Sequence, residues 1–114
     1  MIVQPQSKDV KFSKISSASN GDNTVISAVT NKSIVPIFII LMAAATVNVK
    51  FQDGASGTDL TGLMPLIANV GFSSGYSPVG HFQTSSGNLL NLNLSGAQQV
   101  SGWIVYILDG GNDQ

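Results

Sequence analysis

The stretch NKSIVPIFIILMAAATVNVK, residues 31–50, carries no charged side chain between its two lysines. Such a stretch suits a membrane span, a buried helix or two core strands. A spanning helix needs about 20 apolar residues, and Pro36 would remove a hydrogen bond from its interior. From Thr46 onward apolar and polar residues alternate, which is typical of a strand. The sequence therefore predicts no membrane span but two strands, at about 34–42 and 46–52.

The segment DVKFSKI, near the start of the chain, alternates in the same way. Val10 and Phe12 lie on one side of this predicted strand, and Lys11 and Ser13 lie on the other. This arrangement is typical of a half-buried strand whose apolar side faces a core.

The clearest alternation lies in the segment NLLNLNLS. Leu90, Leu92 and Leu94 are predicted to point inward, and Asn91 and Asn93 outward. The chain contains eight or nine short segments of strand type, separated by turns rich in Gly, Asn and Ser, and no convincing helix. This pattern favours an all-β fold, a single antiparallel β-sandwich or barrel.

Charge limits the possible functions. Charged residues make up 10% of the sequence, against about 25% in ordinary domains. There is no Arg and no Glu, and five Lys with six Asp give a net charge of −1. Nucleic-acid binding needs a stripe of basic residues, which the scattered lysines do not provide. Without cysteine, disulfides and Cys-based metal sites are excluded.

The length of 114 residues suits one domain. We expect an N-terminal arm that leads into the first strand, a β-sandwich and a flexible C-terminal tail. Their predicted bounds are 1–14, 15–108 and 109–114.

The residues predict no catalytic, cofactor or metal site. Asp53 and Asp59 flank the segment GASGT, but a solvated hairpin turn explains them better than a pair of acid–base groups. A calcium loop would end in a bidentate Glu, and the chain has no Glu. His81 is the only histidine, and no G-x-S-x-G nucleophile accompanies it. We therefore predict a turn histidine.

Aromatic residues leave a glycan-binding role open. Carbohydrate modules built on β-sandwiches use exposed aromatic rings together with Asn and Asp. Side chains that would suit such a platform are Phe72, Tyr76, His81, Phe82 and Trp103. A place in the core or in an interface is the alternative for these rings.

Two predicted strands are apolar on both faces, the Ile-rich strand and the final strand. A sandwich buries only one face of each strand, so the second face needs another cover. Loops of the same chain or a closed barrel would provide one cover, and neighbouring subunits of a homo-oligomer would provide another. We predict an oligomer or capsid interface at Ile37, Ile39, Leu41, Trp103, Val105 and Ile107.

Short motifs follow one another between residues 24 and 107. They are Thr30-Asn31-Lys32, Val47-Val49-Phe51 in alternation, Thr58-Asp59-Leu60-Thr61-Gly62, Leu90 to Ser95, and Val100-Ser101-Gly102 with Tyr106. In this order they resemble small all-β proteins encoded among the virion genes of tailed bacteriophages. The resemblance leaves out the first 20 residues. It implies a jelly-roll-like sandwich and a non-enzymatic structural role in the virion, with capsid decoration or cement as the preferred assignment.

The resemblance also implies partners. Such proteins commonly sit as trimers on the capsid lattice, so we expect a homotrimer that binds the major capsid protein at the capsid surface and stabilises the head. The N-terminal residues, with Lys8, Lys11 and Lys14, are expected to be either an arm that reaches a neighbouring capsid subunit or a disordered terminus. A tail, fibre or host-surface module that binds glycans is the alternative role.

Overall fold

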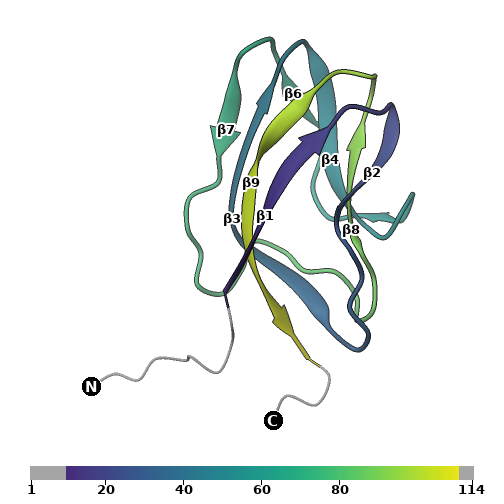
Figure 1. Ribbon diagram of the computed structural model, residues 1–114, viewed down its shortest axis with the longest axis vertical. Helices are drawn as coiled ribbons and strands as arrows, with labels where there is room; N and C mark the ends of the chain where they lie inside the picture. The colour runs from purple at the N-terminus through teal and green to yellow at the C-terminus, as the bar shows by residue number, and fades with distance from the viewer. Residues whose placement is uncertain (1–9, 111–114) are drawn as a thin grey trace.

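The computed structural model describes residues 10–110, which contain nine strands and no helix (Figure 1). None of these residues therefore belongs to a helix that would be long and apolar enough to cross a membrane. The strands are β1 Lys11–Ser17, β2 Gly21–Ile26, β3 Ser33–Ala43, β4 Val47–Asp53, β5 Thr58–Asp59, β6 Met64–Leu66, β7 Gly71–Ser73, β8 Leu90–Leu94 and β9 Val100–Asp109.

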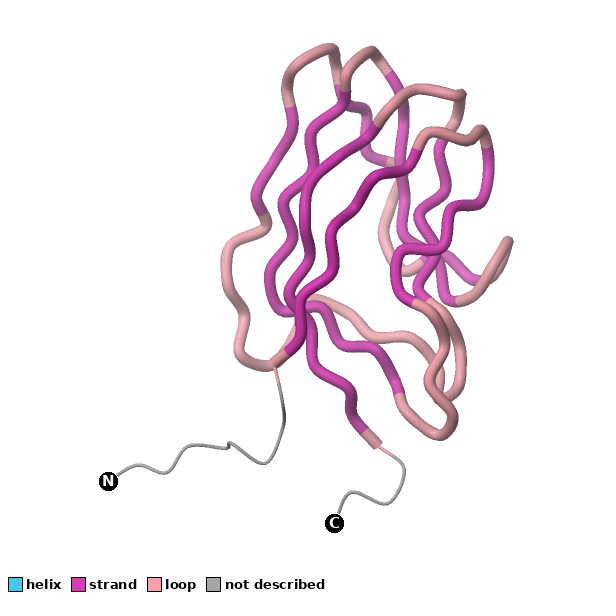
Figure 2. The backbone as a smooth tube through the Cα atoms, in the orientation of Figure 1, coloured by secondary structure: helices cyan, strands magenta, loops and turns pink. Residues whose placement is uncertain are grey.

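The strands form two sheets that pack face to face (Figure 2). Sheet A has the order β1-β9-β3-β7, and sheet B has the order β2-β8-β4-β5, with β6 also paired to β4. Every pairing among the described strands is antiparallel. The predicted all-β antiparallel sandwich is confirmed.

The uncharged stretch forms β3 in sheet A and β4 in sheet B, close to the predicted bounds. A bulge between Pro36 and Phe38 shifts the register of β3 against β9. Proline cannot donate to a neighbouring strand, and within sheets it is often found at bulges. The bulge reverses the sides to which the following residues point. Ile34 before the bulge and Ile39 after it consequently both reach the core.

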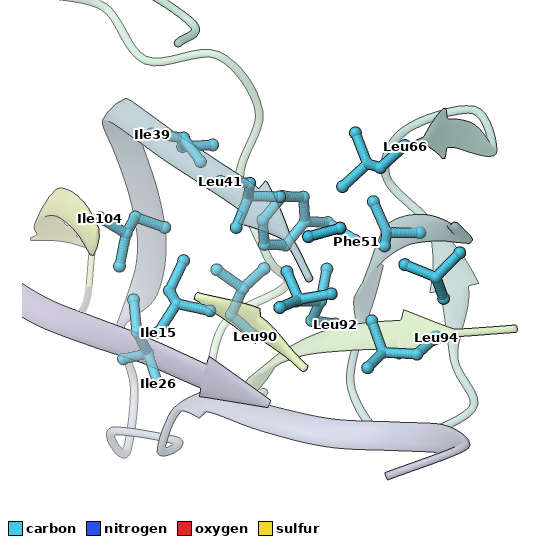
Figure 3. Packing of buried hydrophobic residues seen from close by; sticks show 14 of the residues in the cluster. Ile15, Ile26, Ile39, Leu41, Phe51, Leu66, Leu90, Leu92, Leu94 and Ile104 are labelled. Carbon is cyan, nitrogen blue, oxygen red and sulfur yellow. The ribbon is translucent and has the colours of Figure 1, made fainter. Parts of the chain in front are cut away.

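The core lies between the two sheets, where branched side chains from both layers meet (Figure 3). Leu90, Leu92 and Leu94 of β8 are at most 1% exposed, so their predicted inward direction is confirmed. The labelled residues that pack with them are Ile15, Ile26, Ile39, Leu41, Phe51, Leu66 and Ile104.

The first predicted strand is present as β1, but the side that carries Phe12 faces away from the core. Ile15 and Ser17 are its buried residues. Since strand side chains alternate, burial of Ile15 directs Lys11 and Ser13 to the inner side and Phe12 outward. The predicted inward direction of Phe12 is therefore wrong, because the position of Ile15 decides which side of the strand is buried.

The strand bounds differ from the predicted segments at both ends of the described chain. β1 includes Lys11 and Lys14, so these residues belong to sheet A rather than to an arm. β9 continues through Asp109. The third predicted arm residue, Lys8, lies outside the described residues.

Candidate interaction surface

The outer face of sheet A is apolar. In sheet A, Val105 of β9 lies between Phe12 of β1 and Phe38 of β3. The next row places Trp103 opposite Ile40. Residues directly opposite each other on antiparallel strands share a face, so these side chains project together from the side remote from sheet B. We call this surface the apolar face; its residues are Phe12, Phe38, Ile40, Met42, Trp103, Val105 and Ile107.

Three large side chains of the apolar face are strongly exposed. Phe12 is 73%, Met42 52% and Trp103 48% exposed, and the other members are half-buried. Single exposed apolar residues are ordinary, whereas a contiguous patch marks an interaction site. The register makes this patch contiguous across the three strands β1, β9 and β3.

Part of the same chain covers one end of β3. The connection 74–84 runs beside β3 (Figure 1), and the N–H groups of Ser77 and His81 each donate to a β3 carbonyl at 2.9 Å. Gly80 lies so close to Val35 that a Cβ on the glycine would overlap the valine side chain. Val35 is buried beneath this loop. The loop therefore closes one end of the outer surface and leaves the rest of the apolar face uncovered.

The predicted interface residues of β9 lie on the apolar face. Trp103, Val105 and Ile107 alternate with Ile104 and Tyr106, which belong to the core or pack against it. The predicted division of this strand into two apolar sides is thus present in the structure.

The predicted interface residues of β3 are not on an outer surface. Ile39 and Leu41 are buried in the core, and Ile37 is buried at the bulge. The structure corrects this half of the prediction, because simple alternation through Pro36 ignores the extra residue of the bulge. The proline within a strand pattern is the sequence signal that would have revealed it.

The lysines predicted for an arm occupy different positions in β1. Lys14 is exposed on the outer side of β1, opposite Trp103 of β9. Lys11 is half-buried on the inner side, opposite Tyr106. Lys14 is therefore a charged group at the rim of the apolar face.

The outer face of sheet B is polar and hydrogen-bonded within itself. Asn91 is 0% exposed. Its amide nitrogen donates to Asp22 at 2.9 Å and to Gln52 at 2.8 Å, and its oxygen accepts the N–H of Asn23 at 2.9 Å. Gln52 donates in turn to Asp59 at 3.0 Å. We call these side chains the polar network. Asn91 lies on the outer side of the strand, as predicted, but the network buries it.

The two aspartates that flank GASGT bind different partners. Asp53 accepts the N–H and hydroxyl of Ser85 at 2.9 and 2.6 Å and the amide of Asn88 at 3.0 Å. Asp59 forms an ion pair with Lys50 at 3.1 Å. Asp53 thus ties the end of β4 to the turn before β8, and Asp59 ties β5 to β4. Within residues 10–110 no group of three or more His, Cys, Asp or Glu side chains is arranged to hold a metal ion.

Hydrogen bonds and one ion pair lower the pKa values of Asp22, Asp53 and Asp59 below that of an ordinary aspartate. The Ser56 hydroxyl, which donates to Asp22 at 2.6 Å, is the main cause of the lowered pKa of Asp22. At Asp53 partial burial raises the pKa, but the donors of Ser85 and Asn88 outweigh it. At Asp59 the amide of Gln52 and the ammonium of Lys50 lower the pKa.

We expect the folded protein to lose stability in acid. A carboxyl group whose pKa is lower in the folded than in the unfolded chain stabilises the fold fully above its unfolded pKa of about 3.9, and this contribution disappears as pH falls through the folded pKa. The free energy of unfolding should therefore be flat above about pH 5 and fall below about pH 4. Urea denaturation at a series of pH values measures it. A constant stability down to about pH 2 would contradict the role of these carboxylates.

The aromatic residues considered for a glycan platform are divided between core and surface. Phe82 packs on Phe51 with a centroid distance of 5.4 Å, and Phe72 packs against the core. The His81 ring nitrogen lies 2.9 Å from the Gly75 carbonyl oxygen, which confirms a histidine engaged in its own turn. Trp103 and Tyr76 remain exposed, Tyr76 at 69%.

The sandwich thus presents two outer faces of different chemistry, one apolar and one polar with its hydrogen bonds internally satisfied. The apolar face is the candidate functional surface, because the removal of its uncovered side chains from water by a partner is energetically favourable. A comparison of the sequence with protein-family models and with curated proteins finds no match.

Proposed function

We propose that this chain is a non-enzymatic structural protein of a virion, a capsid decoration or cement protein. It self-associates, binds the lattice of the major capsid protein at the capsid surface and stabilises the head. The observation that carries the proposal is the exposed apolar face of sheet A, with Phe12, Met42 and Trp103 on its surface. Clamping neighbouring subunits needs buried area and complementary shape rather than a reactive group.

The strand order supports a jelly roll, the fold that the resemblance to phage virion proteins implies. Strands β1 to β4 alternate between sheet A and sheet B, and β7, β8 and β9 alternate again. As a result β9 lies between β1 and β3, and β8 lies between β2 and β4. Jelly rolls built of two such sheets are common among capsid proteins.

Mixing the full-length chain with undecorated heads, assembled from the major capsid protein of the same virus, tests the proposal. We expect saturable binding at symmetry-related lattice sites and a raised melting temperature of the heads, since a ligand that binds only the assembled state stabilises it. Cosedimentation and calorimetry measure the two effects. Absence of binding across a range of salt concentrations would overturn the proposal.

A tail, fibre or host-surface module that binds glycans is the second candidate, supported by the exposed rings of Tyr76 and Trp103. Aromatic rings stack on the apolar faces of sugars. A glycan-array signal that Tyr76→Ala or Trp103→Ala abolishes, together with no binding to heads, would favour this role over decoration.

A further inference from the structure

We propose that the apolar face of sheet A is covered by the same face of a second copy of this chain. The inference deepens the proposed function, on whose self-association it rests, by naming the surface through which the copies meet. Self-association can be measured without a capsid, so it succeeds or fails independently of binding to heads.

The apolar face is organised like a protein–protein interface. Its centre is the row of Phe12, Val105 and Phe38, which spans β1, β9 and β3. Towards the rim, polar side chains appear, with Lys14 opposite Trp103 and Ser101 opposite Met42. Specific interfaces commonly have an apolar centre without charge and a polar rim.

The size of the face suits a weak association. Residues 101–107 of β9 extend over about 23 Å, and the three strands that carry the apolar face are about 14 Å wide. The projected footprint is roughly 330 Å² per copy, or roughly 660 Å² for two copies. The side chains that stand out from the sheet add contact area, and interfaces below about 1,200 Å² in total are typical of weak, concentration-dependent complexes.

The polarity of the two outer faces favours packing of the apolar face of one copy on the apolar face of another. The second large outer surface belongs to sheet B, where Asp22, Gln52 and Asp59 belong to the polar network. Packing the apolar face on that surface would remove charged groups from water without giving them new partners, which is costly. Two apolar sheet faces instead pack aligned with interdigitating side chains, as they do inside a sandwich. A second copy supplies such a face at equal concentration.

Sedimentation velocity and light scattering over a dilution series of the full chain test the inference. We expect the wild-type chain to form a dimer, because a face that packs on the same face of another copy is fully covered by two chains. We expect Phe12→Lys and Trp103→Lys each to weaken this association at least about tenfold, as loss of a central aromatic contact does. Because Phe12 is 73% exposed, its substitution should leave the circular dichroism spectrum of the folded chain unchanged.

The matched control is Tyr76→Lys. Tyr76 is a comparably exposed aromatic residue, at 69%, but lies in the connection after β7 rather than on the apolar face. This variant should self-associate like the wild-type chain. A wild-type chain that stays monomeric at about 100 μM, or Phe12→Lys and Trp103→Lys variants that associate as strongly as Tyr76→Lys, would overturn the inference.

Discussion

Gly102→Ala is expected to lower the free energy of unfolding by about 3 kcal/mol. Gly102 lies in β9 between Ile15 of β1 and Leu41 of β3. Its φ of 155° is one that residues with a side chain rarely adopt, and an added Cβ would overlap the carbonyl oxygen of Ile40. Because that oxygen belongs to the backbone of a neighbouring strand, the overlap is relieved only if β3 and β9 separate. The substitution should therefore weaken the pairing at the centre of sheet A.

Gly96→Ala is the matched control for this prediction. Gly96 lies in the turn between β8 and β9, and no atom lies within 4 Å of a Cβ placed there. Its substitution should change the free energy of unfolding by no more than about 0.5 kcal/mol. Urea denaturation followed by Trp103 fluorescence measures both variants. Equal urea midpoints for Gly102→Ala and the wild-type chain would show that β9 tolerates a side chain at this point.

The fold explains the positions of Gly102 and of other residues of the short motifs between residues 24 and 107. Gly102 permits close approach of β9 to β3. In the segment Thr58-Asp59-Leu60-Thr61-Gly62, the Thr61 hydroxyl accepts the Phe51 N–H at 3.0 Å, and Asp59 pairs with Lys50. These residues fasten a short chain segment to β4. These motif residues therefore stabilise the fold, whereas the proposed role depends on the outer surface of sheet A.

Alternation predicted the strands of this chain well, because a period of two residues is a local property. Leu90, Leu92 and Leu94 show it, since all three point into the core. Alternation alone does not say which side of a strand is buried. In β1 the burial of Ile15 reversed the expected side and brought Phe12 to the surface. The packing of Ile15 into the core between the two sheets decides this, and such packing is not a local property of the sequence.

The bulge in β3 explains why the predicted interface residues of this strand are wrong. It inserts one residue between Pro36 and Phe38, so Ile39 and Leu41 enter the core and Ile40 moves to the apolar face. A sequence pattern read at a fixed period cannot place residues beyond such an insertion. The structure confirms that β3 carries apolar residues on both sides, but the residues on each side differ from those predicted.

The polar network was not predicted, because its members come from distant parts of the chain. Asn91 lies 69 residues from Asp22 and 39 residues from Gln52. In the sequence Asn91 looks like one of two equivalent outward asparagines of β8. Only the order β2-β8-β4 in sheet B places a donor or acceptor on each side of it.

Asn91→Asp is expected to lower the free energy of unfolding at pH 7 by about 3 kcal/mol or more, as other unpaired buried charges do. The wild-type amide donates to the carboxylate of Asp22 and to the side-chain oxygen Oε1 of Gln52. A carboxylate in its place would face two acceptors without a proton to donate, at a position that is 0% exposed. Burial and the neighbouring Asp22 charge would both raise the pKa of the introduced group.

The pH dependence separates this effect from a simple loss of packing. Protonation of the introduced carboxyl restores one donor, so the difference between variant and wild type should shrink as pH falls from about 7 to about 5, a range where the wild-type chain keeps its stability. Asn48→Asp is the control, since Asn48 is half-buried on the outer side of β4 but does not belong to the polar network. It should cost no more than about 0.5 kcal/mol at either pH. Equal stabilities of the two variants at pH 7 would mean that the polar network contributes little to holding β2, β8 and β4 together.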